Sequence, residues 1–198
     1  MMCIQYQIKD LTTFMQTEVY ASLDESTKTA LVRKKVELCE KYFLNIAASL
    51  NRNKFHGCYA PHKAVMIMAV MELVESGYIT TNVIRYDKKL KDKFKEIWQE
   101  VVPIGSPFNC DSRTPFTHMA GEPFWKLSDD KGEACITSEA FCAFSHGKSR
   151  MAIKACLLRS IKDDTISEQY GGEHPGINWM VAEDVLGILP LVGFMIAV

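Results

Sequence analysis

Residues 61–77 read PHKAVMIMAVMELVESG, and the rest of the chain can be arranged around this segment. From Ala64 to Val74 only Glu72 is polar, so the segment lacks the polar face of a surface helix. Pro61 and Gly77 suit the first turn and the end of a helix. The segment is shorter than the about 20 residues of a membrane span. It predicts a central helix that other elements cover on several sides.

Amphipathic helices are predicted on both sides of this central segment. Before it, apolar residues recur at spacings of three and four over residues 32–50, after a capping stretch at Asp24–Thr27. After it, Asp87 can cap a helix whose inner face is apolar over residues 90–101. The outer face of that helix carries five lysines within residues 88–95.

Short strands and short helices are predicted in the second half of the chain. Ala120–Pro123 suits the turn of a hairpin, and Asp129–Gly132 suits a second turn. Ser138 and Ser149 can begin two further helices. The expected strands are Ile79–Arg85, Pro115–Met119, Phe124–Leu127 and a short one near Cys135–Ile136. The predicted fold class is therefore mainly α with a small β-hairpin, an α+β arrangement.

Composition limits the class of protein. The 198 residues are 47% hydrophobic and 24% charged, which excludes a disordered chain and a multi-span membrane protein. The net charge of −1 conceals a segregation, with −3 in residues 1–27, +8 in residues 28–95 and −6 in residues 96–198. A basic middle segment is compatible with a surface for a polyanion. The alternative is that its lysines and arginines only solvate two surface helices.

The seven cysteines are irregularly spaced and include no C-x-x-C pair. The N-terminus also lacks the apolar stretch of a signal peptide. We therefore expect a reducing, cytoplasmic environment, with several cysteines serving as small core residues. His56, Cys58 and His62 lie close together in sequence, but no fourth ligand follows at a zinc-site spacing. We expect no bound metal and no cofactor.

Catalytic motifs are absent from the sequence. It contains no G-x-S-x-G, H-E-x-x-H or G-x-G-x-x-G motif, and Gly147-Lys148-Ser149 lacks the first glycine of a P-loop. An HNH nuclease needs a histidine base and a metal-binding histidine, and no intact set of that kind is present. The sequence therefore favours a binding module over an enzyme.

Three segments, in this order and spacing, resemble the N-terminal DNA-reading domain of McrA-like HNH restriction endonucleases. This is the sulfur-binding domain, and the resemblance covers about residues 28–163. It implies a compact, helical, winged-helix-like DNA-reading domain related to restriction-modification and phage defence. The segments are residues 61–77, then Thr114–Met119 with Phe124–Leu127, and then Ser138–Phe141 with Ser149–Arg150 and the helix to Ile161.

The resemblance also implies site residues. Pro115 matches the proline of the family's sulfur pocket, and His62 with Lys63 matches a basic pair that contacts the DNA backbone. Thr114 replaces a tyrosine and His118 replaces a small residue, so the pocket is more polar and little phosphorothioate preference is expected. Arg52 and Lys54 come from the basic loop before the central helix. The predicted DNA-binding residues are Arg52, Lys54, His62, Lys63, Thr114, Pro115 and His118.

Three regions are predicted along the chain. Residues 1–27 form an N-terminal extension, residues 28–163 form the DNA-reading domain, and residues 164–198 form a polar linker with an apolar tail. The uncharged segment Val185–Val198 is interrupted by glycines and a proline, so no membrane span is expected. This tail can instead serve a protein partner or a second copy of the chain.

The predicted function is non-catalytic binding of duplex DNA, either unmodified or modified, by contacts to the backbone. One alternative is an assembly component of a defence or mobile-element system that uses the apolar tail. The other is a degenerate HNH nuclease, for which His174 with Asn178 lies in the appropriate part of the chain.

Overall fold

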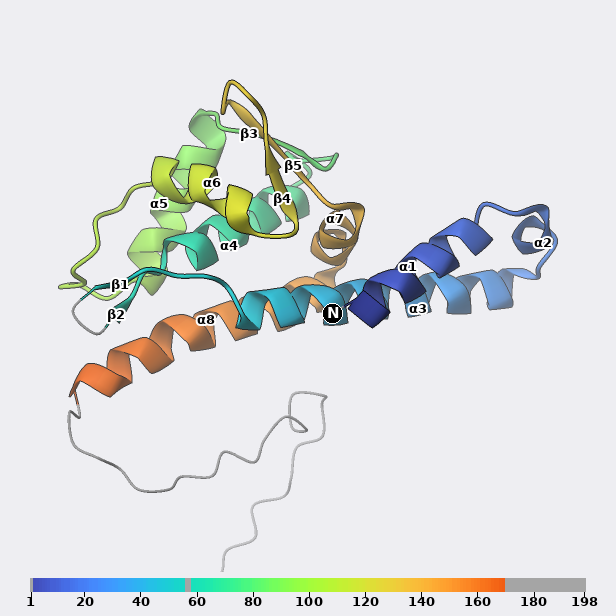
Figure 1. The fold of residues 1–198 in the computed structure, drawn as a ribbon, viewed down its shortest axis with the longest axis horizontal. Coiled ribbons are helices and arrows are strands. Elements are labelled where there is room, and N and C mark those ends of the chain that lie inside the picture. The colour runs from blue at the N-terminus through green and yellow to red at the C-terminus, as the bar shows by residue number, and fades with distance from the viewer. Residues whose placement is uncertain (1, 56–57, 170–198) are drawn as a thin grey trace, which may run out of the picture.

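The computed structural model describes residues 2–55 and 58–169, and Figure 1 shows their arrangement. The fold is mainly α with small antiparallel sheets, as the sequence predicted. The strands are β1 (Lys54–Phe55), β2 (Cys58–Tyr59), β3 (Val83–Arg85), β4 (Trp125–Leu127) and β5 (Glu133–Ile136). The helices are α1 (Met2–Phe14), α2 (Glu18–Ala21), α3 (Glu25–Ala48), α4 (His62–Glu75), α5 (Lys88–Val101), α6 (Arg113–His118), η1 (Met119–Gly121), α7 (Ser138–Ser145) and α8 (Gly147–Gln169).

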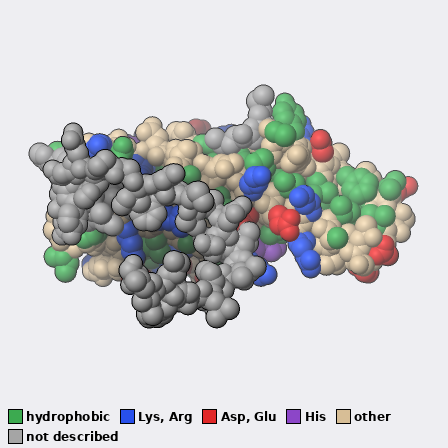
Figure 2. Space-filling view, turned by 90° about the horizontal axis from the view of Figure 1, so that it is seen from below, with side chains coloured by type: hydrophobic (Ala, Val, Ile, Leu, Met, Phe, Trp, Pro, Cys, Tyr) green, Lys and Arg blue, Asp and Glu red, His purple; other side chains and the backbone are tan. Residues whose placement is uncertain are grey.

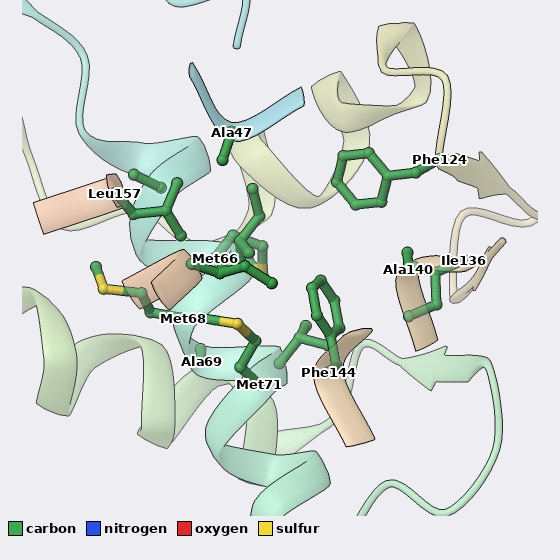
Figure 3. Close-up of a cluster of buried hydrophobic side chains, with 14 of the residues drawn as sticks. Ala47, Met66, Met68, Ala69, Met71, Phe124, Ile136, Ala140, Phe144 and Leu157 are labelled. Carbon is green, nitrogen blue, oxygen red and sulfur yellow. The ribbon is translucent and has the colours of Figure 1, made fainter. Parts of the chain in front are cut away.

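Helix α4 is the predicted central helix. Its residues from Ala64 to Met71 are all buried, and α5, α6, α7 and α8 pack around it. Figure 3 shows Met68 and Met71 of α4 among side chains from other elements, including Phe144 of α7. An apolar surface around the full circumference of a helix must be covered on every side, and these four helices supply the cover.

Three predicted helix ends are confirmed, whereas the helix predicted from Ser149 begins earlier, at Gly147. The Asp24 carboxylate accepts a hydrogen bond from the Thr27 backbone N–H at 2.9 Å and caps α3. Asp87 accepts one from the Leu90 N–H, also at 2.9 Å, and caps α5. Gly77 follows α4 with φ of 72°, a left-handed conformation that glycine adopts without steric cost.

The three-stranded sheet completes a winged-helix-like arrangement. Its strand order is β3-β5-β4, and both pairings are antiparallel. Along the chain the elements run α4, β3, α5, α6, β4, β5, so the first strand separates two helices and a hairpin follows the third helix. The hairpin turn occupies residues 128–132, where a second turn was predicted.

The predicted strand Pro115–Met119 is wrong, because these residues belong to α6 and η1. An Asp111 carboxylate oxygen accepts a hydrogen bond at 2.8 Å from a backbone N–H at the start of α6. Pro115 fits this first turn because its missing N–H has no helical partner there. Phe116 and Met119 are both fully buried, a spacing of three that places them on one helical face. The turn predicted at Ala120–Pro123 therefore joins η1 to β4 and does not close a hairpin.

Both ends of the described chain are helical. Residues 1–22 show no clear helical period in the sequence, yet α1 packs against α3 and buries Ile8. The predicted linker begins inside α8, because this helix continues to Gln169. The apolar segment Val185–Val198 lies outside the described residues. Within residues 2–55 and 58–169, no helix is long and apolar enough to cross a lipid bilayer.

The aromatic cluster between α3 and α7 provides a test of the core. The fully buried Phe43 ring makes edge-to-face contacts with Phe124 and Phe144, at centroid distances of 4.9 and 4.7 Å. We expect Phe43→Ala to lower the free energy of unfolding by about 3–5 kcal/mol, measured by chemical denaturation. The control Val32→Ala alters an exposed residue of α3 and should change it by less than about 0.5 kcal/mol. Similar small effects of both substitutions would contradict this packing.

Candidate nucleic-acid interface

An open pocket of about 360 Å³ lies between the start of α4, the helix α6 with η1, and the segment that precedes β1. It gathers six of the seven predicted DNA-binding residues, although they are spread widely along the sequence. Lys54 lies next to the pocket, on β1, and does not form its wall. The six residues that line it are Arg52, His62, Lys63, Thr114, Pro115 and His118.

Lys63 is part of a buried ion pair. Its ammonium group donates a hydrogen bond to the Glu122 carboxylate, and the two side chains are only 14% and 7% exposed. The pair joins the first turn of α4 to the residue directly after η1, and both α4 and η1 contribute residues to the pocket wall. Since Glu122 neutralises Lys63, the lysine holds the pocket together and does not offer a free positive charge.

His62 has a similar structural position. Its Nε2 donates to the Asn109 carbonyl oxygen at 2.8 Å, and its ring lies 4.6 Å from the Trp98 ring between centroids. Burial lowers the pKa of His62 below its ordinary value, and the Asn109 carbonyl and Asp111 only partly oppose this. The ring is therefore neutral at pH 7 and attaches the loop after α5 to the start of α4.

Helix α6 presents polar side chains to the pocket. The Thr114 hydroxyl donates to Asp111, and this hydrogen bond is the main cause of the lowered pKa of that carboxyl group. Pro115 is buried beneath the pocket wall. His118 is exposed, and its ring has no hydrogen bond to any residue that the structure describes. Thr117 also lines the pocket, so α6 offers hydroxyl and imidazole groups to a ligand.

Two cations border the pocket on the side of the β1–β2 hairpin. The Arg52 guanidinium lies 5.0 Å and the Lys54 ammonium 5.1 Å from the centroid of the Tyr59 ring. Arg52 also donates to the Ser160 carbonyl oxygen at 3.3 Å. Cation–π contacts of this kind restrict long side chains while leaving their charge at the surface.

A second group of cations around an aromatic ring, at Tyr86, was not predicted from the sequence. The Tyr86 ring lies 4.6 Å from the Lys91 ammonium and 4.7 Å from the Arg113 guanidinium. Its hydroxyl forms a hydrogen bond of 2.8 Å with that of Ser112, directly before α6. Arg113 could have been suspected as the basic residue next to the Thr114 motif. Nothing in the sequence distinguishes Lys91 from the other lysines of α5.

The turn between β4 and β5 lies close to α6. The pKa of Asp130 in this turn is lowered mainly by hydrogen bonds from Ser128 and Gly132, and the positive charge of Arg113 contributes as well. Lys131 is exposed at the same turn, with φ of 57°. The turn therefore brings an acidic residue, Asp130, close to Arg113, next to the exposed Lys131.

The opposite side of the molecule has a different charge pattern. Figure 2 views the fold from the side of α3 and α8, and its coloured part shows basic and acidic side chains next to each other. On α3, Lys28 pairs with Glu25 at 3.0 Å, and Lys34 pairs with Glu37 at 4.0 Å. This face is a mixed, self-compensating surface, so α3 supplies suitable control positions.

The described part of the chain contains no candidate metal-binding cluster. No group of three or more His, Cys, Asp and Glu side chains there could hold a metal ion. His56 lies outside the described residues, and so do His174 and Asn178. The possibility of a degenerate nuclease site therefore stays a prediction from the sequence.

No protein-family model matches the sequence, and no curated protein matches it significantly. The resemblance to sulfur-binding domains thus rests on the three sequence segments and stays a prediction.

The buried ion pair gives a stability prediction. We expect Lys63→Ala to lower the free energy of unfolding by about 3 kcal/mol, because the Glu122 carboxylate would stay buried without its partner. The double variant Lys63→Ala/Glu122→Ala removes both charges and should recover much of this loss. Chemical denaturation of both variants measures the difference. Equal losses in the single and double variants would show that the pair does not couple the two elements.

His62 gives a prediction of pH dependence. The unfolded chain binds a proton at His62 near the ordinary pKa of 6.5, whereas the folded chain resists protonation because the ring is buried. His62 therefore makes folding less favourable as the pH falls from about 7.5 to about 5.5. We expect His62→Gln, which cannot be protonated, to show a smaller loss of unfolding free energy over this range. An unchanged pH dependence would contradict the burial of a neutral imidazole.

Proposed function

We propose that this chain is a non-catalytic, winged-helix-like module that binds duplex DNA. The binding surface would be the exposed side of α6 and the cations beside it, which we call the α6 surface. The observation that carries the proposal is that α6 exposes hydrogen-bonding groups between two cation–aromatic clusters. The α6 surface consists of Arg52, Lys54, Lys91, Arg113, Thr114, Thr117, His118 and Lys131.

The position of α6 in the fold supports a groove-reading role. It is the third helix of the α4–α5–α6 set, directly before the hairpin. In helix-turn-helix proteins the second helix of the motif enters the major groove, and its N-terminal residues contact base edges. The Thr114 and Thr117 hydroxyls donate to Asp111 and to backbone carbonyls of α6, so they can accept hydrogen bonds there. His118 can donate or accept through its ring nitrogens.

The charges around α6 support contacts to phosphates. Lys54, Lys91 and Arg113 form no ion pair with any residue in the described part of the chain. Their contacts with Tyr59 and Tyr86 hold them in place without neutralising them. Ordered cations that stand outside ion pairs can release counterions from duplex DNA on binding.

The structure changes the roles assigned within the predicted set. His62 and Lys63, which the resemblance identified as backbone contacts, are engaged with Asn109 and Glu122. Their role in this proposal is to fix the pocket wall. In this proposal the neighbouring cations contact the phosphates instead. Three of them, Lys91, Arg113 and Lys131, were not among the predicted DNA-binding residues.

We further propose, from the resemblance alone, that the chain binds modified DNA in a cytoplasmic restriction or phage-defence system. The polar groups of Thr114 and His118 favour hydrogen-bond acceptors over sulfur, which is softer and less hydrated than oxygen. We therefore expect the chain to bind phosphorothioate DNA with little preference over ordinary DNA. Assembly through Val185–Val198 and nuclease activity at His174 both concern residues outside the described part, and no observation favours either.

Binding of a labelled duplex, followed by fluorescence anisotropy at several salt concentrations, tests the proposal. We expect Arg113→Ala to weaken binding to all sequences and to reduce the salt slope by about one ion, because one phosphate contact is lost. The control Lys34→Ala removes an equal charge from α3, on the mixed face, and should leave affinity and slope unchanged.

Three outcomes would count against the proposal. Absence of salt-dependent duplex binding contradicts the proposed DNA-binding function. Equal effects of Arg113→Ala and Lys34→Ala remove the α6 surface as the binding site. A preference of tenfold or more, about 1.4 kcal/mol, for a duplex with a single phosphorothioate contradicts the polar character assigned to the pocket.

A further inference from the structure

The pocket beside α6 has room for a ligand in addition to the phosphates that the α6 surface would contact. Its volume of about 360 Å³ falls within the range of about 300–1,000 Å³ that is typical of pockets for small organic ligands. Two segments far apart in the sequence contribute to its wall, α6 with η1 and residues 51–53 before β1. A ligand in the pocket would therefore be held by both segments, next to the surface on which we expect DNA to lie.

The basic groups of the pocket wall already have partners within the fold. Lys63 is paired with Glu122, and the buried His62 ring is neutral. The Arg52 guanidinium lies 5.0 Å from the centroid of the Tyr59 ring, at the border of the pocket. The wall therefore suits a neutral ligand better than an anion.

Neutral hydrogen-bonding groups form the rest of the polar wall. The exposed side-chain amides of Asn51 and Asn53 form no hydrogen bond with the rest of the described chain, so each can both donate and accept. The Thr114 and Thr117 hydroxyls already donate within the fold and can accept. The exposed His118 ring can do either. A wall with both donors and acceptors is what the hydrogen-bonding edge of a nucleobase requires.

Small and apolar residues leave space between these polar groups. Ala60, Ala120 and Gly121 contribute to the wall, together with the buried Pro115. A β-carbon added at Gly121 would meet no atom within 4 Å, so this part of the wall is open. The His62 imidazole adds an aromatic ring. Proteins hold a base that has left the duplex by hydrogen bonds to its edge and by packing of aromatic or apolar groups against its faces.

We propose that the pocket binds a single nucleobase that has swung out of a duplex bound on the α6 surface. This binding mode rests on the proposed function, because the duplex must lie on α6 for one of its bases to reach the pocket. Extrusion costs the stacking and pairing of that base, so it is easiest at a mismatched or damaged position. The module therefore prefers duplexes that contain a weakly paired base.

Binding of the full chain to two end-labelled duplexes of equal length, followed by fluorescence anisotropy, tests this binding mode. One duplex carries 2-aminopurine paired with thymine, and the other carries it opposite a mismatched guanine. We expect the mismatched duplex to bind about tenfold more tightly, because its base is easier to extrude. We also expect the 2-aminopurine fluorescence to rise on binding, since the base leaves the stack.

Variants of the wall formed by residues 51–53 show whether the base enters the pocket. The double variant Asn51→Ala/Asn53→Ala removes two amides and alters no charge and no residue of the α6 surface. It should abolish the preference for the mismatched duplex, while binding of the paired duplex stays salt-dependent. The control Asn45→Ala alters an exposed asparagine of α3 that is not part of the pocket wall, and it should keep the preference.

Failure of this binding mode and failure of the proposed function give different results. Salt-dependent binding without a preference for the mismatched duplex, or without the rise in fluorescence, overturns the extruded base and leaves the α6 surface as a duplex-binding site. A preference that survives in Asn51→Ala/Asn53→Ala also overturns it, because the base then lies outside the pocket. Absence of binding to either duplex contradicts the proposed function and this binding mode together.

Discussion

The structure depends on the need to cover α4 on every side. Its residues from Ala64 to Met71 are all buried, so no face of the helix is left to solvent. The cover comes from α5 and α6, which lie between β3 and β4 in the chain, and from α7 and α8, which follow β5. The start of α4 is thereby held in a fixed place, and the wall of the pocket begins there. Site and core are thus parts of one packing arrangement.

Two kinds of side chain form the pocket and its border. Some are bonded to partners within the fold, and others can still contact a ligand. Lys63 and His62 belong to the first kind, since each uses its polar atoms on a partner from another element. His118 belongs to the second, together with Lys54, Lys91 and Arg113, which contact the rings of Tyr59 and Tyr86. A rigid inner wall with available outer groups is the arrangement that a specific binding surface needs.

Elements with local signals could be predicted from the sequence, and those that depend on distant partners could not. The apolar residues of α4 and the N-cap at Asp87 were sufficient to predict the helices α4 and α5. Residues 115–119 were misassigned because they are β-prone, and the Asp111 side chain that accepts from the Arg113 N–H lies in a long loop before them. Six of the seven predicted residues line the pocket, but Glu122 and Asn109, 59 and 47 residues from Lys63 and His62, decide what these two side chains do.

The central position of α4 also has a consequence for the chain during its synthesis. The buried residues Ile153, Leu157 and Ile161 of α8 are part of the cover of the core, and they follow α4 by about 80 to 90 residues. At a translation rate of about 5–20 residues per second, α4 waits for roughly 4 to 18 s before this cover emerges. During that time part of a methionine-rich helix, apolar from Ala64 to Met71, lacks its cover on the nascent chain. Such a segment is a natural target for a ribosome-associated chaperone.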